Sequence, residues 1–271
     1  MVATPIGNLR DITLRALDIL GAAGAVYAED TRVARKLLDA YSLRPRLAAY
    51  HEHNAEAARA EILALLDEGK AVALISDAGT PLVSDPGYKL ARAVIEAGHR
   101  VFPIPGASAS LAALVVSGLP SDRFLFVGFL PAKAGARREA LEGLAAIDAT
   151  LIFYESGPRL AESLADMAAA LGPRPAAVAR ELTKLFEETR RDTLAALAAH
   201  YDEAGAPKGE IVVVVGPPEA APEASDEVLD AYLAEALTRL SVKEAAHAAA
   251  AELRVSRNRA YTRALVIRGG A

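Results

Sequence analysis

Short apolar runs alternate with stretches of helical periodicity along residues 1–118. Residues 25–29 and 71–76 are mostly apolar runs of strand length, and each follows a stretch in which apolar side chains recur every three or four positions. The expected helices cover residues 11–20, 54–69, 87–97 and 108–117. This alternation predicts an α/β domain over residues 1–118.

A second α/β unit is expected over residues 119–217. It begins at the turn-forming sequence Leu119-Pro120-Ser121-Asp122, and residues 135–146 have the pattern of a helix. The expected strands are residues 124–129, 150–154, 176–179 and 210–215. Residues 218–225 are rich in proline and alanine without apolar periodicity, which is typical of a semi-rigid linker.

The last part of the chain, residues 226–271, has only helical patterns. Leucines share one face of residues 226–240, Ser241-Val242-Lys243-Glu244 is a capping box, and Ser256 can cap a third helix. Two short helices that meet across residues 253–255 are typical of a helix-turn-helix. The alternative is a three-helix bundle that serves only for packing.

Charge adds to this picture at the carboxyl end. The whole chain has a net charge of −5, which excludes a uniformly basic nucleic-acid binder, but residues 254–268 contain five arginines and no acid. A local basic patch can contact phosphate even on an acidic protein. A solvated helix face without a partner is the competing interpretation.

Composition excludes several classes. Apolar residues make up 52% of the chain, and the lack of cysteine excludes a disulfide framework and thiolate metal sites. No signal-peptide pattern follows Met1, and no apolar run approaches the ~20 residues of a membrane span, so we expect a cytoplasmic protein without a membrane partner. Dinucleotide-binding, P-loop and nucleophile-elbow motifs are missing. His51-Glu52-His53 lacks further nearby ligands, so we expect no metal.

Three loops rich in glycine, proline and polar residues follow strand-like segments. They are residues 2–8 (VATPIGN), residues 76–87 (SDAGTPLVSDPG) and residues 103–108 (PIPGAS). Glycine allows the backbone to approach a ligand closely, and open α/β sheets bind ligands at the carboxyl ends of their strands. We therefore expect the three loops to form one small-molecule cleft.

These loops belong to an ordered set of motifs that resembles the ribosomal RNA small subunit methyltransferase I family. The set comprises residues 4–13 (TPIGNLRDIT), 28–32 (AEDTR), 51–54 (HEHN), 76–81 (SDAGTP), 85–88 (DPGY), 105–108 (PGAS), 128–131 (GFLP), 153–156 (FYES), 179–184 (ARELTK) and 208–210 (KGE). The short helical tail is also similar to that family's carboxyl-terminal extension. The resemblance covers nearly the whole chain.

The resemblance implies a two-domain α/β fold of the tetrapyrrole-methylase type with a small helical domain, usually as a homodimer. It implies S-adenosylmethionine as cofactor and 2′-O-methylation of a decoding-centre cytidine in the 16S ribosomal RNA of the small subunit. The cofactor contacts that it implies are Pro5, Ile6, Asp77, Thr80, Ser108, Ala109, Tyr154, Ala179 and Arg180. For Asp77, an Asx turn that shapes its own loop is the alternative role.

Methyl transfer to a ribose hydroxyl is an in-line displacement that depends on alignment and on removal of the hydroxyl proton. The candidate catalytic residues are Glu29, Asp30, Glu155, Glu181 and Lys184. Ion pairs that hold the loops are the alternative role for these side chains. The candidate RNA contacts are Arg10, Arg32, Arg35, His51, His53, Arg257, Arg259 and Arg263.

Two other functions stay open at this point. One is a related enzyme that methylates a porphyrin or corrin precursor in the same cleft, and the other is a protein that binds the cofactor or the ribosome without catalysis. The arginine-rich tail favours the RNA substrate, because a free tetrapyrrole needs no such module.

Overall fold

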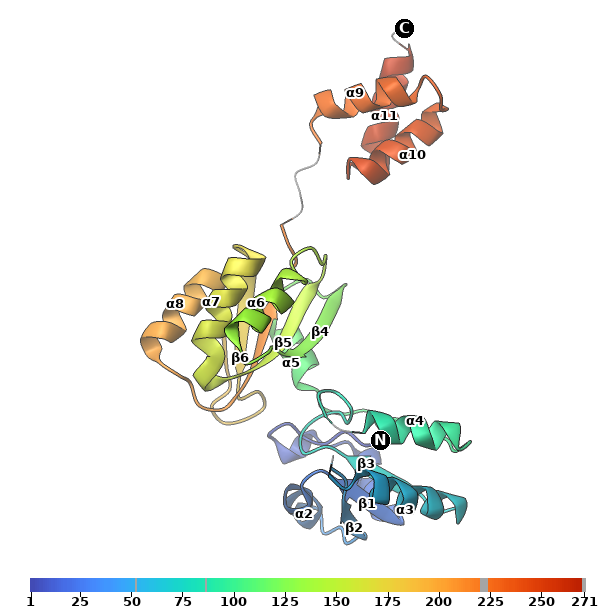
Figure 1. The fold of residues 1–271 in the computed structure, drawn as a ribbon, viewed down its shortest axis with the longest axis vertical. Coiled ribbons are helices and arrows are strands. Elements are labelled where there is room, and N and C mark those ends of the chain that lie inside the picture. The colour runs from blue at the N-terminus through green and yellow to red at the C-terminus, as the bar shows by residue number, and fades with distance from the viewer. Residues whose placement is uncertain (52, 86, 220–223, 270–271) are drawn as a thin grey trace. The chain divides into compact units, whose positions relative to one another are not determined.

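The computed structural model describes residues 1–51, 53–85, 87–219 and 224–269. They form two compact units, residues 1–218 and residues 219–271 (Figure 1). The predicted linker, residues 218–225, includes residues 220–223, which lie outside the described residues. No helix in the described part of the chain combines the length and the apolar character that a bilayer crossing requires.

The first lobe of the larger unit is a three-layer α/β sandwich. Its parallel sheet has the order β2-β1-β3. The strands are β1 (Ala25–Ala28), β2 (Leu47–Ala49) and β3 (Val72–Ile75). Val2 lies between Ile75 and Ile104 through two parallel bridges and extends this sheet.

Helices cover both faces of the first sheet. The helices are α1 (Leu14–Ala22), α2 (Thr31–Ala40), α3 (Ala55–Asp67) and α4 (Tyr88–Glu96). Side chains of α1 and α2 pack with Val26 and Ile75, whereas side chains of α3 and α4 pack with Tyr27 and Leu74. Alternate residues of each strand thus serve opposite cores, which is why these strands are apolar throughout.

Most expected elements of this lobe are confirmed, with shifted ends. The helix expected from residue 11 instead begins at Leu14, because the Thr13 hydroxyl accepts the Ala16 amide as an N-cap. A short 3₁₀ turn, η1 (Leu9–Asp11), precedes it.

The second lobe is built on a five-stranded sheet with the order β4-β5-β8-β6-β7. The strands are β4 (Phe124–Phe129), β5 (Thr150–Ser156), β6 (Pro175–Arg180), β7 (Glu188–Thr193) and β8 (Glu210–Val215). Only β4 and β5 pair in parallel, and the other neighbours are antiparallel. The sequence did not indicate β7, because this exposed edge strand, ETRRDT, has no apolar face.

The two faces of this sheet are covered differently. Three helices lie together on one face: α6 (Ala134–Glu142), α7 (Leu160–Leu171) and α8 (Leu194–Ala204) (Figure 1). The other face packs against α5 (Ala109–Ser117), a helix that the sequence placed in the first domain. A short turn, η2 (Gly157–Arg159), follows β5. Since α5 leaves the first lobe and covers the second sheet, it fastens the two lobes together.

The smaller unit is a three-helix bundle. Its helices are α9 (Asp226–Ala236), α10 (Val242–Glu252) and α11 (Arg257–Gly269). The predicted capping box of Ser241 and Glu244 is confirmed, and the Ser256 hydroxyl accepts the Arg259 amide as predicted for the third helix. Leucines of α9 and alanines of α10 and α11 form its core.

Candidate functional site

Hydrogen bonds join the three loops that the sequence singled out. Thr4 and Gly79 exchange two backbone hydrogen bonds at 2.9 and 3.0 Å, and the Thr4 hydroxyl donates to the Ser76 carbonyl at 3.1 Å. The Thr80 hydroxyl donates to the Ala107 carbonyl at 3.2 Å, which brings in the third loop. The expectation that these loops lie together is confirmed.

The joined loops form one wall of a cavity of about 360 Å³. Strand ends of the second lobe form the opposite wall. Six of the expected cofactor contacts line this cavity: Ile6, Thr80, Ser108, Ala109, Tyr154 and Ala179. Ligand cavities in proteins start at about this volume.

Three expected cofactor contacts lie outside the lining. Pro5, in the first loop, is buried. The Asp77 carboxylate accepts the Asp30 amide at 3.1 Å and so joins the ends of β3 and β1. The Arg180 guanidinium points to Glu188 at 3.0 Å and to the Lys208 carbonyl at 3.1 Å. Asp77 and Arg180 thus hold neighbouring loops in place, and their contact with a cofactor stays a prediction.

The wall from the second lobe presents aromatic rings. The Tyr154 ring packs edge-on against Phe126 and Phe129, with centroids 5.0 and 5.5 Å apart. The pairing of β4 with β5 shifts register between Phe126 and Gly128, which is the signature of a bulge. The bulge places Phe129, whose side chain is 60% exposed, in the cavity lining.

Lys184 connects this wall to the first loop. Its ammonium pairs with Glu181 and Glu210, each at 2.8 Å, while its methylene stem covers the backbone of Gly7 so closely that a Cβ there would clash. Burial alone would lower the pKa of Lys184, but the two carboxylates raise it. The hydrogen bond from Lys184 lowers the pKa of Glu181 in turn. A charged lysine and an ionised, paired glutamate hold this loop and are poorly suited to accept a proton.

Backbone strain accompanies this arrangement. Glu181 and Thr183 have φ of 51° and 66°, in the left-handed region that is costly for side-chain-bearing residues. Gly209, with φ of 102°, faces Glu181, and a Cβ on it would lie 2.5 Å from the Glu181 carboxylate carbon. In the loop of residues 76–87, Leu82 and Ser84 have φ of 74° and 59°, and Ser84 lines the cavity. Strain of this kind clusters at ligand-binding sites.

Glu155 lines the cavity, but its carboxylate is already satisfied. It accepts the Ser163 hydroxyl at 2.5 Å and the Ser156 amide at 2.8 Å, and its side chain is only 1% exposed. Arg159 lies 3.4 Å away and supplies the counter-charge. This residue organises the end of β5.

Asp85 also lines the cavity, and the sequence did not single it out as a catalytic candidate. It lies between the main cavity and a small adjoining one that Glu29 also lines, and its Oδ2 is buried without a hydrogen-bond partner among the described residues. Burial, together with the neighbouring Glu29 and Asp77 carboxylates, raises the pKa of Asp85 to about 6, although interaction with the Ser76 side chain acts in the opposite direction. The only signal in the sequence was the DPGY motif at residues 85–88.

Glu29 and Asp30 follow β1, as expected, but differ in environment. Asp30 caps α2 and pairs with Arg32 at 2.6 Å. The hydrogen bonds from Arg32 lower the pKa of Asp30 to about 2, so it is a weak base. Glu29 is exposed and lies beside Asp85 at the small adjoining cavity.

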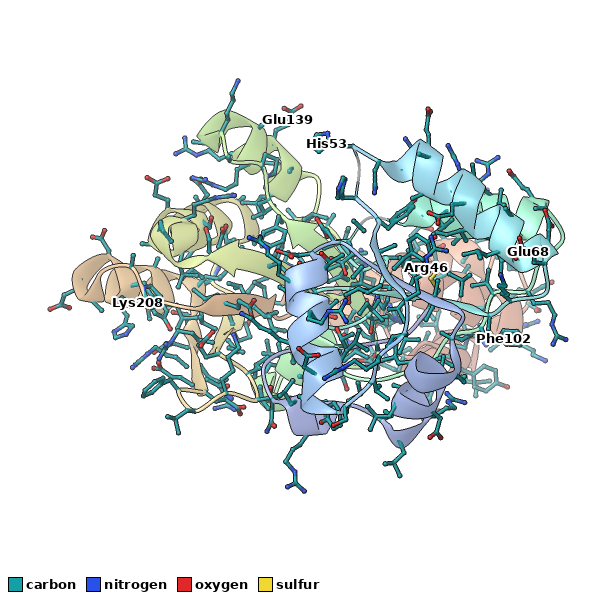
Figure 2. The ribbon with its side chains drawn as sticks, turned by 90° about the horizontal axis from the view of Figure 1, so that it is seen from below. Arg46, His53, Glu68, Phe102, Glu139 and Lys208 are labelled. Carbon is teal, nitrogen blue, oxygen red and sulfur yellow. The ribbon has the colours of Figure 1, made fainter. Side chains whose placement is uncertain are left out.

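The expected RNA contacts of the first lobe lie at its surface. Arg10, Arg32 and Arg35 are exposed on η1 and α2, which the Tyr41 hydroxyl joins by donating to the Leu9 carbonyl at 2.6 Å. His53 is exposed at the start of α3, at the opposite end of that helix from Glu68 (Figure 2). The half-buried His51 ring lies 5.9 Å from His53, and the described residues contain no cluster of metal-binding side chains.

Two of the three expected RNA contacts in the tail are engaged inside the bundle. Arg259 pairs with Asp226 at 2.7 Å and donates to the Ala224 carbonyl at 2.9 Å. Arg263 pairs with Asp226 at 3.1 Å and also with Asp230. Arg257 is exposed. These pairs hold α11 against α9, and contact of Arg259 and Arg263 with RNA stays a prediction.

Sequence comparisons place this architecture among known proteins. Residues 1–198 match the family model described as tetrapyrrole (corrin/porphyrin) methylases. A ribosomal RNA small subunit methyltransferase I of Mesorhizobium japonicum is 60% identical over 92% of this chain and 85% of its own length. Proteins of the same name from Erythrobacter litoralis and Escherichia coli O157:H7 are 54% and 46% identical over 99% of this chain, and over 94% and 95% of their own lengths.

Solved structures are similar in fold. The chain is similar to a uroporphyrin-III C-methyltransferase from Thermus thermophilus, with a TM-score of 0.57 and 24% identity. It is also similar to a cobalt precorrin-4 methyltransferase, with a TM-score of 0.59 and 18% identity. Each match covers 79% of this chain and 92% of the other. At this level of identity the likeness concerns the fold alone.

Proposed function

This chain belongs to the tetrapyrrole methylase family, within its ribosomal RNA small subunit methyltransferase I group, and from that premise we propose that it methylates a ribose 2′-hydroxyl of 16S ribosomal RNA. The acceptor in this proposal is a cytidine of the decoding centre. The methyl donor of this family is S-adenosylmethionine. The observation that carries the proposal is the cavity in which the three joined loops face the strand ends of the second lobe.

The residues present fit this donor. Ile6, Ala109 and Ala179 give the cavity apolar surface for the adenosine and the methionine stem. Ser108 and Thr80 add hydroxyls for polar ends. Asp85 brings negative charge toward a sulfonium, which is the charge that a cationic donor requires. The apolar lining and the acidic side chain together match a ligand that is partly hydrophobic and locally positive.

Bound S-adenosylmethionine supplies an electrophilic methyl group on a positively charged sulfur. The part of this chain is to align the sugar oxygen with that methyl group and to accept the hydroxyl proton as the new bond forms. We assign the proton to the Asp85 carboxylate, because this residue lines the cavity and its Oδ2 has no hydrogen-bond partner in the geometry of the described residues. Glu155, Glu181 and Asp30 already receive hydrogen bonds from cationic or hydroxyl groups.

The RNA backbone belongs outside this acidic cavity. Arg10 and Arg35 are exposed and form no ion pair with residues that the structure describes, so they suit phosphate. Arg32 is 87% exposed at its side chain although it pairs with Asp30.

We also propose a homodimer, which is the assembly that the family resemblance implies. The proposed contact is the solvent face of α5, where Val115 is 81% exposed. We propose that the methylation of the ribosomal RNA takes place in the cytoplasm.

The decisive experiment locates the methyl group. The protein is incubated with labelled S-adenosylmethionine and small ribosomal subunits that lack this modification, and the modified nucleotide is identified by nuclease digestion and mass spectrometry. We expect label on a 2′-O-methylcytidine of the decoding centre. Label on a base, or label only on a tetrapyrrole precursor offered in parallel, contradicts the proposal. Binding of the donor without turnover would identify a non-catalytic binding protein.

A further inference from the structure

One face of α11 carries positive charge and an aromatic ring without internal partners. Arg257, Tyr261 and Arg268 are four and seven positions apart, so their side chains fall within a narrow sector of the helix. All three are exposed. The side chains of Arg257 and Arg268 form no hydrogen bond or ion pair with any residue that the structure describes.

The opposite charges of the bundle are used internally. The acids of α9 that face α11 are Asp226 and Asp230, and both pair with Arg259 or Arg263. Arg239, in the turn after α9, pairs with Glu235, and Tyr232 donates its hydroxyl to Glu252. Asp226 and Asp230 are therefore engaged in the packing of α11 on α9, while the cations of one α11 face lie in solvent.

The start of α11 has the position that the start of the second helix has in a helix-turn-helix. A short turn of residues 253–256 joins α10 to α11, and Arg254 in it adopts φ of 53°. Arg254 is exposed and adds a further positive charge beside Arg257. In such motifs the first residues of the second helix reach the base edges. Here these residues are Arg257, Asn258 and Tyr261, two donors and a stacking ring.

We propose that this face, Arg257, Asn258, Tyr261 and Arg268, docks unpaired ribosomal RNA near the nucleotide that is methylated. The proposal rests on the proposed function and adds the surface by which the tail recognises the substrate. Exposed bases stack on aromatic rings while arginines contact the flanking phosphates, and this combination is typical of single-stranded RNA recognition. The acidic cavity does not attract phosphate, so a separate cationic surface serves that need.

The test compares variants of the full chain in binding to small ribosomal subunits that lack the modification, with a labelled single-stranded RNA as a second probe. We expect Arg257→Glu with Arg268→Glu to weaken RNA binding at least about tenfold and to reduce the slope of log K against log salt by about 1.4, which corresponds to two phosphates. Tyr261→Ala is expected to weaken binding about five- to a hundredfold with the slope unchanged, since stacking is uncharged.

The control is Arg239→Glu, the same charge reversal in the turn after α9 of the same bundle, where the side chain is 72% exposed. We expect binding within about twofold of the parent. Helical content by circular dichroism identifies an unfolded bundle, and Arg257→Gln with Arg268→Gln then replaces the reversal. Donor affinity, measured by calorimetry, is expected to be unchanged in every variant.

Unchanged RNA binding in the double variant, an equal loss in Arg239→Glu, or tighter binding to duplex DNA than to RNA would overturn this inference. These outcomes are separable from failure of the proposed function, because the parent protein is assayed for methyl transfer alongside. A parent that methylates the subunit while the double variant binds equally well refutes the docking surface alone. A parent that transfers no methyl group refutes the enzyme.

Discussion

The two lobes bring carboxylates to the same cavity, but their surroundings differ. In the second lobe, Glu155 receives hydroxyl and amide hydrogen bonds, and Glu181 receives the Lys184 ammonium. In the first lobe, Asp85 has a buried oxygen without a donor among the described residues and lies near the carboxylate of Glu29. A carboxylate that already accepts several hydrogen bonds helps to fix the shape of the site. A carboxylate with a free oxygen and a raised pKa can instead accept a proton.

The largest effect is expected from Asp85→Asn. This variant keeps the shape of the side chain but removes the proton acceptor, so we expect kcat to fall about 10²- to 10⁴-fold. The lost negative charge is expected to weaken binding of the cationic donor as well, by a smaller factor. The parent kcat/KM is expected to fall as the pH drops below about 6, because Asp85 becomes protonated. The residual rate of the variant is expected to be flat through this range.

Initial rates with labelled donor across pH 5–9 measure this effect. Asp148→Asn, which alters an exposed pair with Arg123, is the control and is expected to retain the parent rate. A full rate in Asp85→Asn would move the proton acceptor to another group.

The same exchange of carboxylate for amide is expected to change stability in opposite directions in the two lobes. The pKa of Asp85 is raised on folding, so its contribution to stability is present at acidic pH and is lost as the pH rises through about 6. At pH 8, Asp85→Asn should therefore unfold with a free energy about 1 to 3 kcal/mol higher than the parent. Near pH 3 the difference should vanish, because Asp85 is protonated in both states.

Glu155→Gln should instead lower the free energy of unfolding by about 2 kcal/mol, because a buried acceptor of several hydrogen bonds is weakened. Urea unfolding of the two variants and the parent, followed by circular dichroism, measures both changes. Shifts of the same sign in both variants would remove the contrast between the lobes.

The smallest effect is expected at the contact between the lobes. Lys184→Met keeps the methylene stem over Gly7 but leaves Glu181 and Glu210 without their common cation. We expect the Kd for the donor to rise about three- to tenfold, since a partly exposed ion pair contributes about 1 kcal/mol. Lys208→Met is the matched control, because Lys208 is exposed and marks the neighbouring loop in Figure 2. Calorimetric titration of the donor distinguishes the two variants.

Much of the fold was predictable because buried apolar residues recur at regular intervals in the sequence. Strands such as β3 and β8 are apolar on both faces, and the helices around them repeat their apolar side chains every three or four positions. The strand β7 was not predictable, since an exposed edge strand can be entirely polar. The placement of α5 was not predictable either, because its apolar side chains fit either lobe and only tertiary packing decides between them.

The parts of the site that depend on loop positions were predictable from the sequence. The parts that depend on which charged side chains pair with one another were not. Loop residues such as Ile6, Thr80 and Ser108 line the cavity because their backbone positions follow the strand ends. The isolation of Asp85 and the engagement of Arg259 and Arg263 depend on which charges meet in space. The spacing of residues along the chain does not show which charged side chains will be close together in the fold.

The acidity of the cavity also bears on what happens after the methyl group has left. The donor arrives with a positive sulfur, but the spent cofactor is a neutral thioether, so Asp85 and its acidic neighbours attract it less strongly. If Asp85 holds the hydroxyl proton at that moment, the cavity has lost part of its own negative charge as well. Methyl transfer would thus lower the affinity of the cavity for the spent cofactor, so the release of this product would need no further conformational change.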